Sequence, residues 1–251
     1  MDYGISGKTA LVTGAKRGIG YAAAVMFAKA GVNTVFIDID DTKEETEELK
    51  KLGLSVLSIK CDVSNEQHVK SAVEHIVSHF GSLDIAFNNA GIQTPQKLMH
   101  EITTEEYLNT VNVDLSGIWH FMHYEIEQML KQGSGAIINT SSQGGVTGFP
   151  GQAAYIACKH AVIGLTRTAA IDYAQKNIRI NAVCPGAILT PMAKELIKRN
   201  KNVETKLLRD IPMGRLGNPD EIAHAVLWLA SPGASFVTGH ALIADGGFTV
   251  K

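Results

Sequence analysis

The stretch that decides the fold is TALVTGAKRGIG, residues 9–20. An apolar run of strand character leads into Gly14, Gly18 and Gly20, and a helix-like apolar segment follows over 21–29. Glycines at a strand-to-helix turn let the backbone approach a pyrophosphate, whose charge the helix N-terminus then meets. The spacing differs from the common G-x-G-x-x-G pattern, so the turn taken alone also fits a glycine-rich turn that binds no ligand.

Working outward from this turn, short apolar runs alternate with longer segments of helical period. Strands are predicted at 9–13, 34–37, 55–59, 83–87, 136–139, 178–183 and 241–244. They are apolar nearly throughout, which is typical of strands buried on both faces of a parallel sheet. We therefore expect one α/β domain over 1–251: a Rossmann-type, doubly wound sheet of seven mainly parallel strands with helices on both faces.

Helix starts are marked by capping signals between these strands. Ser64 with Gln67 and Thr103 with Glu106 have the spacing of a capping box, and Asn218 precedes a proline suited to the first turn. The segment 189–217 contains no clear strand and is too long for an ordinary connection. We expect it to be a substrate-binding lid within the domain.

Composition restricts the partners and the compartment. Hydrophobic residues make up 45% and charged residues 19% of the chain, so a large core is expected, and the net charge of -2 argues against nucleic acid or a membrane surface as a partner. No signal peptide or membrane-length apolar run is visible, which predicts a cytoplasmic protein. Cys61, Cys158 and Cys184 are widely spaced and are predicted to be buried free thiols, with no metal site.

Polar residues follow three of the predicted strands at one edge of the sheet. Asp38 ends the second strand eighteen residues after Gly20, where a carboxylate can accept hydrogen bonds from an adenosine ribose. Asp62 follows the third strand near the expected adenine position, although a simple turn explains an aspartate there equally well. The small and amide residues 88–91 follow the fourth strand and suit a backbone that packs against a dinucleotide.

A second group of residues lies beyond the fifth predicted strand. Ser142 comes soon after the strand, and Tyr155 and Lys159 follow at i, i+4, which places them on one helix face. A phenol is a poor base at neutral pH, but a nearby ammonium favours its ionised form. A Tyr-x-x-x-Lys pair taken alone also fits an ordinary pair on a helix surface.

Taken together, these motifs resemble the short-chain dehydrogenase/reductase family. The motifs occur in the family's order and spacing from the first strand to the carboxyl terminus: 13–20, Asp38, Asp62-Val63, 88–91, Ser142, Tyr155 and Lys159, Pro185-Gly186 with Thr190, and 245–247. The resemblance covers essentially the whole chain. It implies an oxidoreductase that moves a hydride between a nicotinamide cofactor and a secondary alcohol or ketone.

The family's residue roles carry over to the matching positions. The resemblance implies that Tyr155 is the general acid/base, that Lys159 favours its ionisation and binds the nicotinamide ribose, and that Ser142 orients the reacting oxygen. The implied cofactor-binding set is Gly14, Arg17, Gly18, Ile19, Gly20, Asp38, Asp62, Val63, Asn89, Ala90, Gly91, Tyr155, Lys159, Pro185, Gly186, Ile188 and Thr190.

One position departs from the family pattern. The family has a fourth catalytic residue, an asparagine three residues before a glycine or small residue, which supports a helix kink. Counting back from Gly117 gives Asp114, whereas Asn112 lies two residues earlier and about 200° around the helix. We therefore place Asp114 at the catalytic position. A near-isosteric aspartate is compatible with activity.

The choice of cofactor rests on conflicting signals. Asp38 would accept from the ribose 2′-hydroxyl and repel a 2′-phosphate, which favours NAD. Lys16 and Arg17 point the other way, because a basic residue before Gly18 accompanies NADP in many similar enzymes. We expect Asp38 to decide for NAD, with an NADPH-dependent carbonyl reductase of the same family as the alternative. A nicotinamide-binding redox sensor or a transferase on a similar fold would not need Ser142, Tyr155 and Lys159.

The substrate and the assembly follow from weaker signals. Besides Ser142 and Tyr155, the substrate is expected to meet Gln143, and the pocket to include Gln93, Thr94, Gly144, Gly145 and Gln152, which mildly favours a neutral cyclic or polyol-like substrate. The expected helices 104–130 and 153–174 are apolar on more than one face, so one face needs a partner. Similar enzymes pair these helices across a two-fold axis, which implies a homotetramer.

Overall fold

β1 (Thr9–Thr13) is an interior strand of a seven-stranded sheet in the order β3-β2-β1-β4-β5-β6-β7, and every neighbouring pair is parallel. The other strands are β2 (Asn33–Asp38), β3 (Val56–Lys60), β4 (Ile85–Asn88), β5 (Gly135–Thr140), β6 (Ile178–Pro185) and β7 (Ala241–Ala244). This computed structural model describes residues 3–199 and 208–251. The predicted single-domain, doubly wound α/β fold with a parallel sheet is confirmed.

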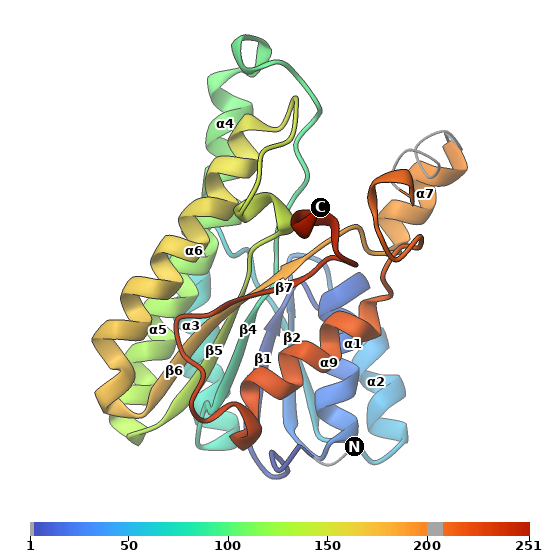
Figure 1. Cartoon of the computed structure of the whole chain (residues 1–251). Coiled ribbons are helices and arrows are strands. Elements are labelled where there is room, and N and C mark those ends of the chain that lie inside the picture. Colours follow the sequence, from blue (N-terminus) through green and yellow to red (C-terminus); the bar gives the residue numbers. More distant parts are fainter. Residues whose placement is uncertain (1–2, 200–207) are drawn as a thin grey trace.

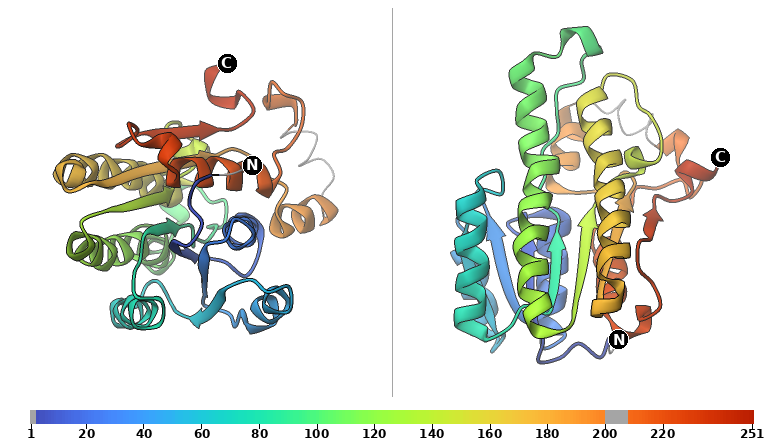
Figure 2. Two further views of the ribbon diagram at one scale, coloured as in Figure 1. Left: turned by 90° about the horizontal axis from the view of Figure 1, so that it is seen from below. Right: turned by 90° about the vertical axis from the view of Figure 1, so that its left-hand side faces the viewer.

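Helices cover both faces of the sheet (Figure 1, Figure 2). One face carries α1 (Gly18–Lys29), α2 (Lys43–Lys51) and α9 (Pro219–Ala230). The other carries α3 (Glu66–Phe80), α5 (Gly117–Gln132) and α6 (Ala153–Tyr173). Each layer has its own apolar core, because the strands are apolar on both sides and each helix turns one apolar face toward them.

Two of the three predicted helix starts are confirmed. Thr103 caps α4 (Thr104–Val111) in a reciprocal box with Glu106, and Asn218 precedes Pro219 at the start of α9. The third prediction, a cap at Ser64, is wrong by one residue. Both the N–H and the hydroxyl of Ser64 donate to Asp62 Oδ1, so Ser64 belongs to the turn, and Asn65 caps α3 instead.

The segment 189–217 leaves the sheet and returns at one place. A single parallel bridge joins Ile188 to Gly217, and the Leu189 N–H donates to the Gly217 carbonyl at 2.7 Å. Between these points the described chain contains α7 (Pro191–Arg199), which lies beyond the carboxyl ends of the strands in Figure 1. Part of the predicted lid, residues 200–207, lies outside the described residues.

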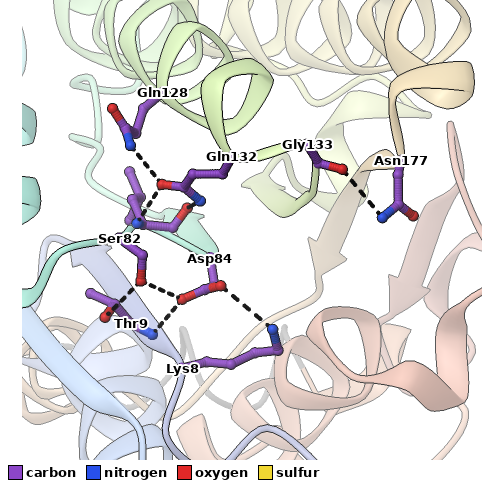
Figure 3. Close-up of polar contacts among 9 residues, drawn as sticks. Lys8, Thr9, Ser82, Asp84, Gln128, Gln132, Gly133 and Asn177 are labelled. Carbon is purple, nitrogen blue, oxygen red and sulfur yellow. Dashed lines mark hydrogen bonds and ion pairs between the residues drawn. The ribbon is translucent and has the colours of Figure 1, made fainter.

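The opposite end of the sheet is closed by side-chain hydrogen bonds. Asp84, just before β4, accepts from the Thr9 N–H at 2.9 Å and from the Ser82 hydroxyl at 2.9 Å (Figure 3). The Gln132 amide at the end of α5 pairs with both backbone groups of Leu83. These bonds fix the amino ends of the strands, which leaves the carboxyl ends for the functional site.

Candidate active site

The glycine turn after β1 forms a cradle that only glycine can provide. A Cβ on Gly20 would lie 2.1 Å from the Gly14 carbonyl oxygen, and one on Gly14 would lie 3.0 Å from Ala90 Cα. Gly14 and Gly18 have φ of +65° and +63°, which strains other residues. Arg17 caps α1 without a side-chain hydrogen bond, and the first turn of α1 has no acid. Its N–H groups are therefore available to an anion such as a dinucleotide pyrophosphate.

Asp38 lies beside this turn at the carboxyl end of β2. Its two carboxylate oxygens accept from the backbone N–H groups of Lys16, at 2.9 Å, and Asp40, at 3.1 Å. The Lys16 ammonium points away to Glu45 at 2.7 Å and to the Asp41 carbonyl at 2.8 Å. The carboxylate is thus fixed at the edge of the cradle, whereas one of the two basic side chains of the turn is already paired.

The residues after β4 are joined to β1 by a threonine that sequence analysis did not single out. Thr13 Oγ1 accepts from the N–H groups of Asn89 and Ala90, at 2.8 and 2.9 Å. The Asn89 amide in turn donates to the Thr13 carbonyl at 3.1 Å. Thr13 ends a strand and faces a neighbouring strand end, which is the signal that could have identified it.

Asp62 and Val63 follow β3 at the same edge. Asp62 Oδ1 accepts from the N–H and the hydroxyl of Ser64 in the turn that leads to α3. Val63 is buried and packs so closely on Gly117 that a Cβ there would lie 2.7 Å from Val63 Cγ2.

The loop after β6 closes over the glycine turn. The Gly186 N–H donates to the Ala244 carbonyl at 3.0 Å, which ties the Pro185-Gly186 step to β7. Further along, Thr190 begins α7 by accepting from the Ala193 N–H. A Cβ on Gly18 would lie 3.3 Å from Thr190 Cγ2. The glycine turn at Gly18 and the implied nicotinamide loop at Thr190, 172 residues apart in sequence, are therefore in close proximity.

Tyr155 and Lys159 lie together beyond β5, and Ser142 follows directly on the strand end that Lys159 contacts. The Lys159 ammonium lies 5.4 Å from the centre of the Tyr155 ring and donates to the Thr140 carbonyl at 3.3 Å. The Ser141 hydroxyl donates to the Lys159 carbonyl at 2.8 Å, which fixes the end of β5 against α6. Ser142 Oγ accepts from the Gly144 N–H and starts a short 3-10 turn over Gln143–Gly145.

Asp114 lies in a π-helical turn, Asn112–Ser116, between α4 and α5. Its side chain is fully buried, and Oδ1 lies 2.9 Å from the Ile92 nitrogen, which donates to it, and 3.8 Å from Lys159 Nζ. Burial raises the pKa of Asp114, while the Lys159 ammonium and the Ile92 N–H oppose that rise. Asn112 is exposed two residues earlier. The structure therefore brings Asp114, and not Asn112, to the lysine.

A buried polar network beneath the site was missed from the sequence. Glu125 on α5 is fully buried and accepts from the Asn88 amide at 3.0 Å, and Asn88 also donates to Asn139 on β5. The Asn139 amide donates to Thr166 on α6 at 3.0 Å. Burial raises the pKa of Glu125 to about 8. A glutamate in register with the apolar residues Phe121 and Met129 was the available signal.

The residues proposed to line a substrate pocket differ in their placement. Gln143 Oε1 is buried without a hydrogen-bond partner, and Gln93 is exposed. Gly144 and Gly145 are buried, and a Cβ on Gly145 would lie 2.2 Å from Ser141 Oγ, so these glycines allow the turn to pack on α6. Among the described residues a pocket of about 310 Å³ lies between the loops that follow β6 and β7, lined in part by Ala187, Ile188, Ile211, Met213 and Gly246.

Three further observations concern the rest of the described chain. Cys61, Cys158 and Cys184 are all buried and free, as predicted. Within residues 3–199 and 208–251, no set of three or more histidine, cysteine or acidic side chains is arranged to hold a metal ion. Over the same residues, the helices are all too short or too polar to cross a membrane.

Comparisons with known proteins agree with this geometry. The family model described as enoyl-(acyl carrier protein) reductase matches residues 14–249. The chain is 40% identical over 253 residues to cyclohexanol dehydrogenase from Acinetobacter sp. (strain SE19), covering 100% of this chain and 98% of that protein. It is also 40% identical over 246 residues to a 2,5-dichloro-2,5-cyclohexadiene-1,4-diol dehydrogenase from Sphingobium indicum, covering 98% of each.

A solved structure is similar to this chain over nearly its whole length. The structure of ElxO with NADP bound superimposes with a TM-score of 0.92 at 34% identity, covering 97% of this chain and 99% of that one. The fold, the site and these likenesses define an oxidoreductase of the kind that uses a nicotinamide cofactor. The chain belongs to the short-chain dehydrogenase/reductase family.

Proposed function

We propose that this protein is an NAD-dependent dehydrogenase of secondary alcohols, and the corresponding ketoreductase in reverse, with Tyr155 as the acid/base. The observation that carries the proposal is the Lys159 ammonium 5.4 Å from the Tyr155 ring, at the carboxyl ends of the strands and beside the glycine cradle. A bound nicotinamide ring supplies the acceptor or donor of the hydride. The chain's own residues orient the alcohol and move its proton.

The proton step is assigned to three side chains. The Ser142 hydroxyl, whose Oγ accepts from the Gly144 N–H, donates a hydrogen bond to the substrate oxygen and fixes its position. The ionised Tyr155 oxygen then takes the hydroxyl proton while the carbinol carbon gives up its hydride, which leaves a ketone and a neutral phenol. Lys159 favours the ionised phenol because its ammonium is buried close to the ring.

A bound cofactor would be held at the glycine turn and along the strand ends. The pyrophosphate would lie against Gly14, Arg17, Gly18, Ile19 and Gly20, and Asp38 would accept from the adenosine ribose. Asp62 and Val63 would border the adenine side, Asn89, Ala90 and Gly91 would pack against the dinucleotide, and Pro185, Gly186, Ile188 and Thr190 would border the nicotinamide side. The fixed Asp38 carboxylate and the pairing of Lys16 with Glu45 support NAD. The NADP-bound relative and the exposed Arg17 keep NADP as the alternative.

The proposed substrates are neutral cyclic secondary alcohols. Both curated relatives are named for six-membered ring alcohols. Gln143 adds an uncharged amide next to Ser142, which suits a neutral ring better than a carboxylate. The segment 189–217, anchored at Ile188 and Gly217, is proposed to be the lid over this substrate. We also propose that the enzyme is cytoplasmic.

Replacing Tyr155 by phenylalanine tests the acid/base role. The variant keeps the ring against Lys159 but lacks the group that accepts the proton. We expect kcat for a cyclic secondary alcohol to fall by about 10²- to 10⁴-fold, with Kd for NAD nearly unchanged. Steady-state kinetics and a fluorescence titration with NADH measure the two quantities. A variant that retained more than about a tenth of the wild-type kcat would refute the role of Tyr155.

A further inference from the structure

The reaction centre contains a buried carboxylate close to the buried ammonium. Asp114 Oδ1 lies 3.8 Å from Lys159 Nζ, and both side chains are almost completely shielded from solvent. Asp114 Oδ2 has no hydrogen-bond partner. A Cβ on Gly91 would lie 2.6 Å from Asp114 Oδ1 and 3.5 Å from Lys159 Nζ, so the glycine covers both groups.

The other titratable groups around this pair are neutral or more distant. Cys158, next to Lys159 on α6, is held neutral because burial raises the pKa of its thiol to about 11. Burial also raises the pKa of Cys184 on β6, which feels both Lys159 and Arg167. Tyr155 faces the ammonium from one helical turn away. Among the described residues, Asp114 is the acid that forms an ion pair with Lys159.

We propose that Asp114 is ionised, that it is the buried counterion of Lys159, and that its charge sets the pH range in which the enzyme oxidises alcohols. An asparagine at this position would have the same shape and could accept from Ile92 in the same way, but it would carry no charge. Asp114 acts through Lys159 and is therefore a positioning residue. The inference rests on the proposed role of Tyr155.

The direction of the effect follows from the charges. An anion beside the ammonium weakens the attraction between that ammonium and an ionised Tyr155. Alcohol oxidation requires the ionised phenol, so activity rises with pH through its ionisation. Removing the Asp114 charge favours the ionised phenol and therefore moves this rise to lower pH. If Asp114 were protonated, it would already be neutral, and its replacement by asparagine would leave the pH of this rise unchanged.

The test compares wild type with Asp114→Asn and with Glu105→Gln, which removes one exposed negative charge from α4. The pH dependence of kcat/KM for cyclohexanol oxidation is measured for all three. We expect the midpoint of the rise to move to lower pH by roughly one unit in Asp114→Asn. Glu105→Gln is expected to leave it unchanged.

A spectroscopic titration keeps the test decisive if Asp114→Asn has little activity. The ultraviolet signal of tyrosinate is followed with pH in each protein, and the signal of the same protein with Tyr155→Phe is subtracted. The Tyr155 ionisation is expected to shift to lower pH in Asp114→Asn. Unchanged midpoints in both measurements would overturn the proposal for Asp114. A Tyr155→Phe enzyme that remained active would instead overturn the proposed function.

Discussion

Lys16 and Arg17 occupy adjacent positions in the glycine turn, but their side chains have different surroundings. Lys16 is paired with Glu45, and the Glu45 carboxylate raises the pKa of its ammonium, so this cation is already engaged. Arg17 is exposed at the start of α1. Asp38 is fixed by two backbone N–H groups. The rigid Asp38 carboxylate therefore favours NAD, whereas the solvated Arg17 favours NADP.

Asp38→Ala is expected to reduce the preference for NAD over NADP by at least tenfold. A carboxylate about 4 Å from a 2′-phosphate costs several kcal/mol at an effective dielectric near 20, whereas a solvated arginine recovers about 1 kcal/mol. The measurement is kcat/KM for both cofactors in wild type and variant. A wild-type enzyme that preferred NADP would show that Arg17 prevails, and unchanged selectivity in the variant would show that another group decides.

Single residues in the site differ in how well the sequence predicted them. The glycine turn, Asp38 and the Tyr155/Lys159 pair were predictable because short-range spacing defines them. Asp114 could be aligned only by counting from Gly117, and the structure places it at the lysine. The partner of Glu45 was not predictable, because the ion pair joins two segments 29 residues apart through side-chain rotamers.

At the scale of elements, Glu125 links α5 to the strands that lead into the site. The polar chain runs from Glu125 through Asn88 and Asn139 to Thr166, and so joins β4, β5 and both long helices. Burial raises the pKa of Glu125 from 4.5 to about 8, so the folded protein holds a proton that the unfolded chain releases. Stability should therefore fall as pH rises from about 4.5 to about 8 and level off above.

Glu125→Gln is expected to remove this pH dependence while keeping the acceptor for Asn88. At pH 7 the variant should gain on the order of 3 kcal/mol in unfolding free energy relative to wild type, and little at pH 4. Denaturant unfolding between pH 4 and pH 8 measures the free energy of unfolding of both proteins. Glu127→Gln, on the exposed face of α5, is the control. Parallel stability curves for wild type and Glu125→Gln would show that Glu125 is not protonated in the folded protein.

The sequence predicted elements well where a local pattern determines them. β1 and β7 have the predicted bounds, because apolar runs end there at glycine-rich turns. The predicted helix 104–130 is found as α4 and α5 joined by a π-helical turn. The apolar pattern alone does not indicate that turn, whereas the family resemblance implied a helix kink at Asp114, whose Oδ1 accepts from the Ile92 N–H in the loop after β4. The predicted cap at Ser64 is wrong because the Ser64 hydroxyl donates to Asp62, and Asn65 caps α3 instead.

At the scale of the whole molecule, the sheet places all of the candidate catalytic groups at one end. The amino ends of the strands are closed by Asp84 and Gln132. Away from the site, the long helices retain exposed apolar side chains: Trp119 on α5 is 47% exposed and stacks on His123, and Ile171 on α6 is 79% exposed. Apolar groups of this size on a helix face favour a protein partner.

We expect the enzyme to be a homotetramer in which these helices pair across a two-fold axis. Burial of Trp119 against the partner would remove a large apolar area from water. Light scattering at micromolar concentration gives the molecular mass of the assembly. Trp119→Glu places a charge in the interface and should therefore lower this mass. A stable wild-type monomer under these conditions would contradict the assignment.

The most direct test of the central claim follows the hydride itself. The enzyme is mixed with NAD and cyclohexanol that carries deuterium on the carbinol carbon, and both products are analysed by mass spectrometry. We predict cyclohexanone and reduced cofactor in equal amounts, with the deuterium in the cofactor. Reduced cofactor without deuterium, or no turnover with cyclohexanol and related cyclic secondary alcohols, would contradict the account.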